Sequence, residues 1–284
     1  MLKPYYLLAK PGIIRGNAIT ATAGFFLASK GNIDFSLYIA MLGGLSLTIA
    51  SACVFNNYID RDIDSKMART KKRALVSGTI SVTSALIYAL ILGIIGAALL
   101  ALFINLITLA IALIGLFFYV VAYGYFKRHS VYGTLVGSIS GAVPPVVGYT
   151  SVSGSIDLAA AILFLILVMW QMPHFFAIAI YRFKDYRTAG IPVLPVKKGL
   201  LNTKINMFVY IVAFIFTCLA LGIFGYTGFT YLLVVLALGF FWLRLGLQGF
   251  GAADDRAWAK KMFKSSLLVI TLLSLTISLD AWLP

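Results

Sequence analysis

Three aspartates stand at the end of a strongly apolar segment, in a chain whose nine acidic residues include no glutamate. They are Asp60, Asp62 and Asp64, and Asn56 precedes them by one helical turn. If a helix that begins near Ser36 continues through this stretch, Asn56, Asp60 and Asp64 recur at i, i+4 and i+8 and face the same side. Such an oxygen-rich stripe suits Mg²⁺, which proteins usually bind with one or two carboxylates plus substrate phosphates. Asp62 is expected to point the other way.

A basic run follows the aspartates and offers the opposite charge. Arg69, Lys72 and Arg73 lie within nine residues of Asp64. Arginine can bind phosphate oxygens through two parallel hydrogen bonds, so the pattern indicates a diphosphate held beside the metal. The alternative is that these charges only neutralise one another in a solvated loop, where exposed ion pairs contribute little.

A second, weaker cluster occurs far along the chain. Asp185 stands among Arg182, Lys184 and Arg187. Asp185 would either complete the metal site or neutralise its neighbours. Taken with the first cluster, it predicts a bipartite site in which two aspartate groups hold Mg²⁺ against a diphosphate.

Four further residues are candidates for substrate contact. Tyr123 and Lys127 are one helical turn apart, so a hydroxyl and an ammonium could face the same substrate oxygen. His174 lies within an apolar segment and His129 lies at the end of another. A histidine inside a membrane is a candidate iron ligand, although a hydrogen-bonded structural role is the alternative.

The elements that carry these residues must be membrane helices. The chain of 284 residues is 61% hydrophobic and only 11% charged, which is the composition of an integral membrane protein. An apolar stretch of about 20 residues crosses the bilayer as a helix. We predict an all-α fold, a single domain over residues 1–284, with nine transmembrane helices packed around a central cavity. The nine predicted helices are at 11–29, 36–57, 79–99, 102–124, 132–150, 158–181, 205–224, 229–248 and 265–283.

The basic residues predict the orientation of these helices. If the N-terminus is cytoplasmic, every one of the 23 lysines and arginines except Lys30 falls on the inner side, as the positive-inside rule requires. The C-terminus is then outside, and the long connections 58–78 and 182–204 place the polar clusters at the cytoplasmic mouth of the cavity. The net charge of +14 is explained by topology, so nucleic-acid binding is not expected.

Small and rigid residues are expected to shape the cavity. Gly133, Gly137 and Gly141 recur every fourth residue and allow a neighbouring helix to approach closely. The segment from Gly190 to Pro195 is predicted to form a stiff turn over the cavity.

These motifs together resemble the UbiA-type intramembrane prenyltransferase superfamily. Its first signature, Asn-Asp-x-x-Asp-x-x-x-Asp, is similar to Asn56-Asn57-x-x-Asp60-x-x-x-Asp64, and its second, Asp-x-x-x-Asp, corresponds to Tyr181-x-x-x-Asp185. Within the superfamily the resemblance is to the branch that farnesylates protoheme IX (haem B). It rests on the segments 53–64, 127–128, 141–145, 170–174 and 189–195.

The resemblance implies a set of roles for these residues. Asn56, Asp60, Asp64 and Asp185 would be the catalytic Mg²⁺ ligands, and His174 or His129 would contact haem. The diphosphate would be bound by Asn57, Arg69, Lys72, Arg73, Tyr123, Lys127, Arg182 and Lys184. The loss of an aspartate at Tyr181 leaves the number of metal ions open.

The resemblance also implies the substrates and the cellular setting. These are farnesyl diphosphate and haem B, in the cytoplasmic (inner) membrane of a bacterium, with haem A synthase or a terminal oxidase as candidate protein partners. Two alternatives remain at this point: prenyl transfer to another acceptor, such as 4-hydroxybenzoate or a naphthoate, and a cation-coupled transporter. A transporter would place its charges near the bilayer midplane and be built from inverted repeats.

Overall fold

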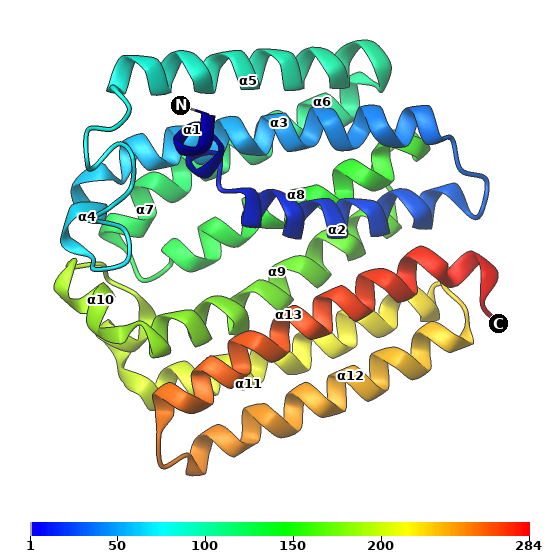
Figure 1. Cartoon of the computed structure of the whole chain (residues 1–284). Coiled ribbons are helices and arrows are strands. Elements are labelled where there is room, and N and C mark those ends of the chain that lie inside the picture. Colours follow the sequence, from blue (N-terminus) through cyan, green and yellow to red (C-terminus); the bar gives the residue numbers. More distant parts are fainter. Residues whose placement is uncertain (1) are drawn as a thin grey trace.

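Long helices run side by side through the whole molecule (Figure 1). The computed structural model describes residues 2–284, and within that range every regular element is helical. The elements are α1 (Leu2–Leu8), α2 (Pro11–Ser29), α3 (Phe35–Ile59), α4 (Arg61–Lys66), α5 (Val82–Phe103), α6 (Leu106–Phe117), the π-helical segment η1 (Phe118–Ala122), α7 (Tyr123–His129), α8 (Gly133–Ser153), α9 (Leu158–Tyr181), α10 (Phe183–Thr188), α11 (Leu194–Ile223), α12 (Phe229–Gln248), η2 (Gly249–Gly251), α13 (Asp255–Leu279) and η3 (Asp280–Trp282).

Within residues 2–284, eight helical stretches are long and apolar enough to cross a membrane, which confirms a multi-pass membrane protein. Their bounds are Phe35–Ile59, Val82–Phe103, Leu106–His129, Gly133–Ser153, Leu158–Tyr181, Leu194–Ile223, Phe229–Gly251 and Asp255–Trp282. The ninth predicted span forms α2, a helix of 19 residues, but it is not among these eight. Four polar residues lower the mean hydropathy of α2, namely Arg15, Asn17, Thr20 and Thr22.

Helix ends explain where several of the aspartates lie. Asp34, Asp157 and Asp254 are N-caps, and each side chain accepts hydrogen bonds from backbone N–H groups of the helix that follows. N-caps of this kind satisfy donors that a helix leaves free. Asp280 accepts from the Gly228 N–H at 3.0 Å, and Asp255 pairs with Lys204 at 2.5 Å.

The remaining acidic residues lie at one end of the bundle. Asp60, Asp62, Asp64 and Asp185 belong to the α3–α4 junction and to α10, and Figure 1 shows α4 and α10 together at its left side. The C-terminus lies at the opposite end of the long helices. The acidic residues without a capping or packing role are therefore concentrated at one mouth of the bundle.

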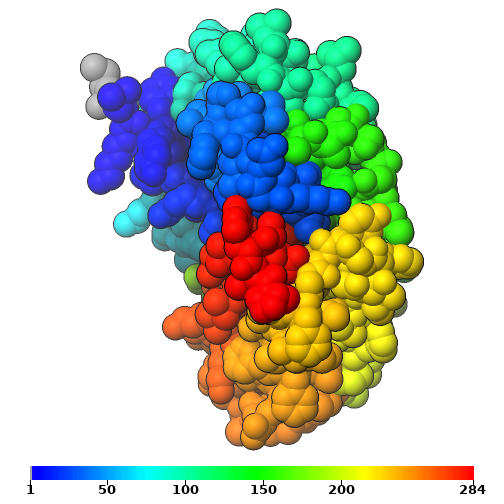
Figure 2. All heavy atoms as spheres, turned by 90° about the vertical axis from the view of Figure 1, so that its right-hand side faces the viewer, coloured from blue at the N-terminus to red at the C-terminus, as the bar shows by residue number. Residues whose placement is uncertain are grey.

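The opposite end is closed by packing of the C-terminal segment. Figure 2 shows the C-terminal residues (red) directly against the blue segment that follows α2. The rings of Trp282 and Phe26 are 6.3 Å apart. This contact ties α13 and η3 to α2.

Two glycines bring α2 and α8 into backbone contact. A Cβ on Gly24 would lie 1.9 Å from the carbonyl oxygen of Pro145, and a Cβ on Gly148 would lie 1.9 Å from that of Ala21. Only glycine allows such an approach, which is the packing mode of small residues between membrane helices. The contact fixes α2 against α8 on one side of the internal cavity.

Candidate functional site

The junction between α3 and α4 carries three of the four side chains predicted to bind metal. The helix that begins near Ser36 does not run on through this stretch without a break, because α3 ends at Ile59 and Asp60 has non-helical torsion angles (φ −86°, ψ 1°). The i, i+4 spacing nevertheless holds: Asp60 N–H donates to the Asn56 carbonyl at 2.9 Å, and Asp64 N–H donates to that of Asp60 at 2.8 Å. Asn56, Asp60 and Asp64 are all buried and line one cavity.

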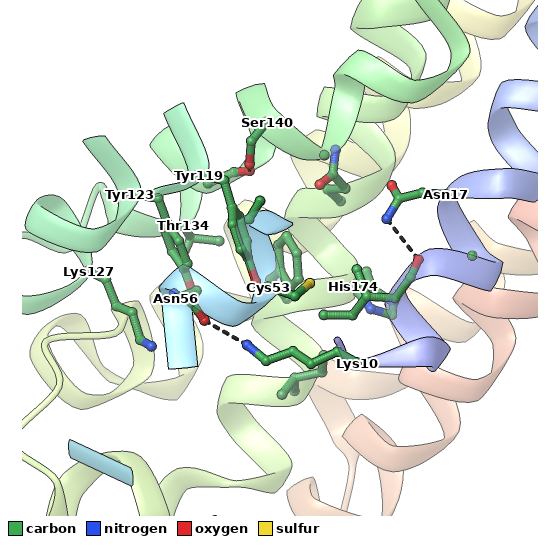
Figure 3. Close-up of a pocket in the computed structure, with 18 of the residues that line it drawn as sticks. Lys10, Asn17, Cys53, Asn56, Tyr119, Tyr123, Lys127, Thr134, Ser140 and His174 are labelled. Atoms are coloured by element: carbon green, nitrogen blue, oxygen red, sulfur yellow. Dashed lines mark hydrogen bonds between the residues drawn. The ribbon is translucent and has the colours of Figure 1, made fainter. Parts of the chain in front are cut away.

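Each of these side chains is bound by a different basic residue. Lys127 Nζ lies 2.5 Å from Asp60 Oδ2, and an Arg73 nitrogen lies 2.5 Å from Asp64 Oδ2. Lys10 Nζ donates to Asn56 Oδ1 at 2.7 Å, as Figure 3 shows. A buried carboxylate is costly without such a partner, so the lysines and the arginine stabilise the oxygens in these positions.

The side-chain oxygens of this cluster are suited to bind Mg²⁺ together with a diphosphate. Asp60 Oδ1 is buried and has no hydrogen-bond partner in the described part of the chain, so one carboxylate oxygen remains free for a cation. Among residues 2–284 no three His, Cys, Asp or Glu side chains form a ready-made metal site. Mg²⁺ characteristically takes its remaining ligands from substrate phosphates and water, and the arrangement is suited to that kind of binding.

Asp62 lies apart from the cluster, as predicted. Its carboxylate is exposed and binds the guanidinium of Arg128 at 2.7 and 2.8 Å. The hydrogen bond from Arg128 lowers the pKa of Asp62 to about 2. This pair joins α4 to α7 on the outer side of the site.

A π-helical turn positions the next group of residues. η1 precedes α7, and such turns often occur at functional sites. The rings of Tyr119 and Tyr123 stack at 5.8 Å, and Lys127 Nζ lies 5.6 Å from the Tyr123 ring centre. A Cβ on Gly137 would lie 2.8 Å from the Tyr123 ring. The predicted close approach at Gly137 therefore serves to seat Tyr123 in the cavity wall.

The second acidic cluster lines the same cavity from α10. Asp185 and Arg182 both line it, and their charged groups are 3.8 Å apart. Tyr186, the residue after Asp185, also lines it, and burial raises the pKa of Tyr186 to about 12. The hydroxyl of Tyr186 therefore stays protonated at neutral pH and can donate a hydrogen bond.

Two loops cover the mouth of the cavity together. Ile63 and Met67 at α4 pack against Ile191 and Val193 after α10. The residues from Ile191 to Val193 line the cavity, and Gly190 has φ +70°. The conformation at Gly190 agrees with the predicted turn at the cavity. The apolar contacts between the two loops join the two acidic clusters.

Four predicted site residues do not line this cavity. Asn57 is buried, but its Nδ2 donates to the Leu8 carbonyl at 2.7 Å and so ties α1 to α3. Lys72 and Lys184 point to the exposed surface. His129 is exposed, stacks on Tyr125 at 4.4 Å and contacts the Tyr125 carbonyl. Arg69, by contrast, does line the cavity.

The cavity extends from the polar mouth into the apolar interior. Its volume is about 860 Å³, a size typical of pockets for large ligands. Leu45, Ile49 and Leu116 are among the apolar residues along its walls, and His174 and Trp170 lie on the α9 side. The space thus combines a charged entrance with a long hydrophobic chamber.

Comparison with known proteins identifies the family. The model of the UbiA prenyltransferase family matches residues 17–268. The chain belongs to the UbiA prenyltransferase family. The protoheme IX farnesyltransferases of Escherichia coli K12 and Shigella boydii serotype 4 are each 53% identical to it over 285 residues, covering 100% of this chain and 96% of theirs.

Solved structures share the fold of this UbiA family member. A digeranylgeranylglyceryl phosphate synthase superposes with a TM-score of 0.82 at 21% identity, covering 99% of this chain and 98% of the other. A UbiA homologue from Archaeoglobus fulgidus, bound to GPP and Mg²⁺, gives a TM-score of 0.68 at 15% identity, covering 96% and 99%. At these identities the likeness shows the fold alone.

Two cavity residues of this UbiA protein escaped the sequence-based prediction. Lys10 lies 46 positions from Asn56 in sequence, and its left-handed backbone (φ 53°) aims it into the cavity. Burial lowers the pKa of Lys10 to about 8. Tyr119, whose ring stacks on that of Tyr123, is the second of these cavity residues. The sequence does hold a signal for Lys10, because it stands directly before Pro11, the first residue of the first long helix.

Proposed function

We infer that this protein makes haem O by transferring the farnesyl group of farnesyl diphosphate to a vinyl group of haem B. The observation that carries this function is the 53% identity to protoheme IX farnesyltransferases over the whole length of the chain. It favours haem over 4-hydroxybenzoate or a naphthoate as the acceptor. Membership of a prenyltransferase family speaks against the transporter.

The polar mouth is suited to hold the leaving diphosphate. Asn56, Asp60 and Asp64 would hold Mg²⁺, with Asp185 approaching from α10. When bound, Mg²⁺ supplies Lewis-acid neutralisation of the departing charge, and UbiA homologues have been solved with Mg²⁺ and prenyl diphosphates. The number of ions stays open because Tyr181 replaces one carboxylate.

Basic side chains supply the rest of the neutralisation. Lys127, Arg73 and Lys10 now bind the carboxylate and amide oxygens of the acidic cluster, and Arg69 and Arg182 line the same mouth. We expect them to turn to the diphosphate oxygens when the substrate is bound. Cationic donors fixed around a leaving group lower the barrier because they stabilise the charge that develops there.

The apolar chamber protects the reactive farnesyl group. Loss of diphosphate leaves an allylic cation, which water would convert to farnesol. The stacked rings of Tyr119 and Tyr123 offer π faces that attract a cation. A vinyl group of haem B then attacks the cation, which moves the positive charge to the vinyl carbon next to the porphyrin ring. Water adds to that carbon and loses one proton to the departed diphosphate, which gives the hydroxyethylfarnesyl substituent.

The topology is a proposal that follows from charge. We propose nine spans, with α2 as the ninth, the N-terminus and the polar mouth in the cytoplasm and the C-terminus outside, in a bacterial cytoplasmic membrane. The exclusion of lysine and arginine from the other side, apart from Lys30, supports this orientation. Contact with haem A synthase or a terminal oxidase stays a prediction.

The test is product formation by the purified protein. Detergent-solubilised protein is incubated with haem B, radiolabelled farnesyl diphosphate and Mg²⁺, and the porphyrin is separated and weighed by mass spectrometry. We expect label on the porphyrin and none when Mg²⁺ is chelated. Label on 4-hydroxybenzoate but not on haem, in a parallel reaction, would overturn the choice of acceptor.

A further inference from the structure

His174, in the cavity wall, is hydrogen-bonded to a serine of the neighbouring helix. Its Nδ1 lies 2.7 Å from the Ser266 hydroxyl on α13. Its ring stacks on Trp170 at 4.8 Å, and Trp170 Nε1–H donates to the Ser266 carbonyl at 2.8 Å. The side chain is 8% exposed and lines the cavity. Ser266 thus fixes both aromatic rings of α9 in place.

The hydrogen bonds assign the tautomer of this histidine. The Ser266 hydroxyl donates its one proton to the Phe263 carbonyl at 2.7 Å, so toward the imidazole it can only accept. His174 must then carry its proton on Nδ1. Within residues 2–284 the hydrogen bond of the His174 ring is made by Nδ1, and Nε2 makes none. A nitrogen lone pair is therefore presented from the wall of a chamber that otherwise is largely apolar.

The surroundings favour a metal ligand over a proton acceptor. A histidine that acts as a base usually has a carboxylate at Nδ1 to stabilise the imidazolium, whereas here the partner is a neutral hydroxyl. A metal-bound histidine needs its other N–H held by an acceptor, which sets the tautomer and ring orientation. The Ser266 hydroxyl meets that requirement.

We propose that Nε2 of His174 binds the iron of the acceptor haem as an axial ligand, and that Ser266 is the positioning residue that keeps this lone pair directed into the cavity. The proposal rests on the proposed function, because it takes haem B as the acceptor. His174 and Phe175 line the cavity beside Phe263 of α13, whose ring is 5.0 Å from that of His174. A flat aromatic macrocycle suits such a wall.

This ligation would also separate the two substrates along the cavity. His174 precedes Tyr181, at the end of α9, by seven residues, which corresponds to roughly 10 Å at 1.5 Å per residue. The iron would thus lie deeper than the diphosphate at the mouth. Fixing the macrocycle by its centre leaves its vinyl-bearing rim free to meet the farnesyl cation.

The experiment measures haem ligation without farnesyl transfer. Haem B is titrated into the purified protein, with neither Mg²⁺ nor farnesyl diphosphate, and absorption and resonance Raman spectra are recorded. Wild type should give the spectrum of histidine-ligated haem with an iron–histidine stretch in the ferrous state. In His174→Gly the spectrum of histidine-ligated haem should be lost, and added imidazole should restore it.

Ser266 is tested by a second set of variants. Ser266→Ala should weaken haem binding by about 10- to 100-fold, as loss of a partner of a metal-bound histidine does, and shift the iron–histidine stretch. Ser266→Thr keeps the hydroxyl, so it should retain the wild-type affinity for haem and the wild-type iron–histidine stretch. Ser274→Ala removes another buried serine of α13, has no hydrogen bond to His174, and should leave the spectrum unchanged.

The outcomes separate this proposal from the proposed function. A wild-type protein that farnesylates haem B, but whose haem spectrum is unaltered in His174→Gly, would overturn the ligation alone. An unshifted stretch in Ser266→Ala would overturn the role of Ser266. A histidine-ligated haem in a protein that never transfers farnesyl would leave the ligation standing and remove the proposed function.

Discussion

The oxygens of the acidic cluster and the basic side chains around it hold one another in place. Asp60 is paired with Lys127 and Asp64 with Arg73, whereas Asp62 is exposed and paired with Arg128. The three aspartates lie within five residues of one another, yet only two line the cavity. This difference gives a matched set of carboxylates with which to test the site.

Removing one charge at a time should separate the roles of these aspartates. Asp60→Asn and Asp64→Asn should each lower kcat for farnesyl transfer by at least about 10²-fold, the usual loss when charge stabilisation of a leaving group is removed. Asp62→Asn should change kcat less than twofold. Steady-state kinetics at saturating Mg²⁺ measures the effect, and thermal unfolding checks that each variant is folded. Equal losses in all three would contradict the assignment.

Lys10 should contribute mainly to substrate binding. Its ammonium binds Asn56 in the substrate-free structure and is positioned to reach a diphosphate, and a hydrogen bond to a charged group is worth about 1.5–3 kcal/mol. Lys10→Met should therefore raise KM for farnesyl diphosphate by about 10- to 100-fold. Lys30→Met is the control, because Lys30 has the same left-handed backbone (φ 47°) at the other end of α2 but is exposed.

At the scale of elements, the cavity depends on backbone contact between α2 and α8. Gly24 and Gly148 allow this contact. Gly12, also on α2, has no neighbour within 4 Å of the position of a Cβ. The two ends of one helix thus differ in whether they tolerate a methyl group.

Alanine substitutions on α2 should expose this difference. Gly24→Ala places a methyl group against a backbone carbonyl, which cannot move without shifting α8, so we expect a loss of about 1–3 kcal/mol in the free energy of unfolding. Gly12→Ala should have little effect. Thermal unfolding in detergent, followed by circular dichroism, compares the two. An unchanged melting temperature in Gly24→Ala would mean that the helices do not pack this closely.

The local sequence pattern predicted the helices better than it predicted the long-range contacts of individual side chains. The apolar runs and the spacing of Asn56, Asp60 and Asp64 identified the helices and the cluster, because these signals lie within a few turns of chain. The pattern did not show that Asn57 lies outside the cavity, with its amide donating to the Leu8 carbonyl, and Lys10 was missed because Asn56 is 46 residues away. Such tertiary contacts leave no periodic trace in the sequence.

At the scale of the whole molecule, the distribution of basic residues and the position of the active site both predict the same orientation in the membrane. The basic residues other than Lys30 are expected on the side where α4 and α10 cover the cavity. The C-terminal residues lie at the far end, against the segment after α2 (Figure 2). If the positive-inside rule holds, diphosphate is both bound and released on the cytoplasmic side.

Cysteine labelling in intact cells tests this orientation and the ninth span together. Cys53 and Cys218 are buried, so single exposed cysteines can be introduced on that background. Lys30→Cys, just after α2, should react with a membrane-impermeant maleimide from outside. Lys184→Cys on α10 and Leu2→Cys on α1 should react only after the membrane is permeabilised. Because Leu2 and Lys30 lie on either side of α2, labelling of both from the same side would mean that α2 does not cross the bilayer, and labelling of Lys184→Cys from outside would invert the molecule.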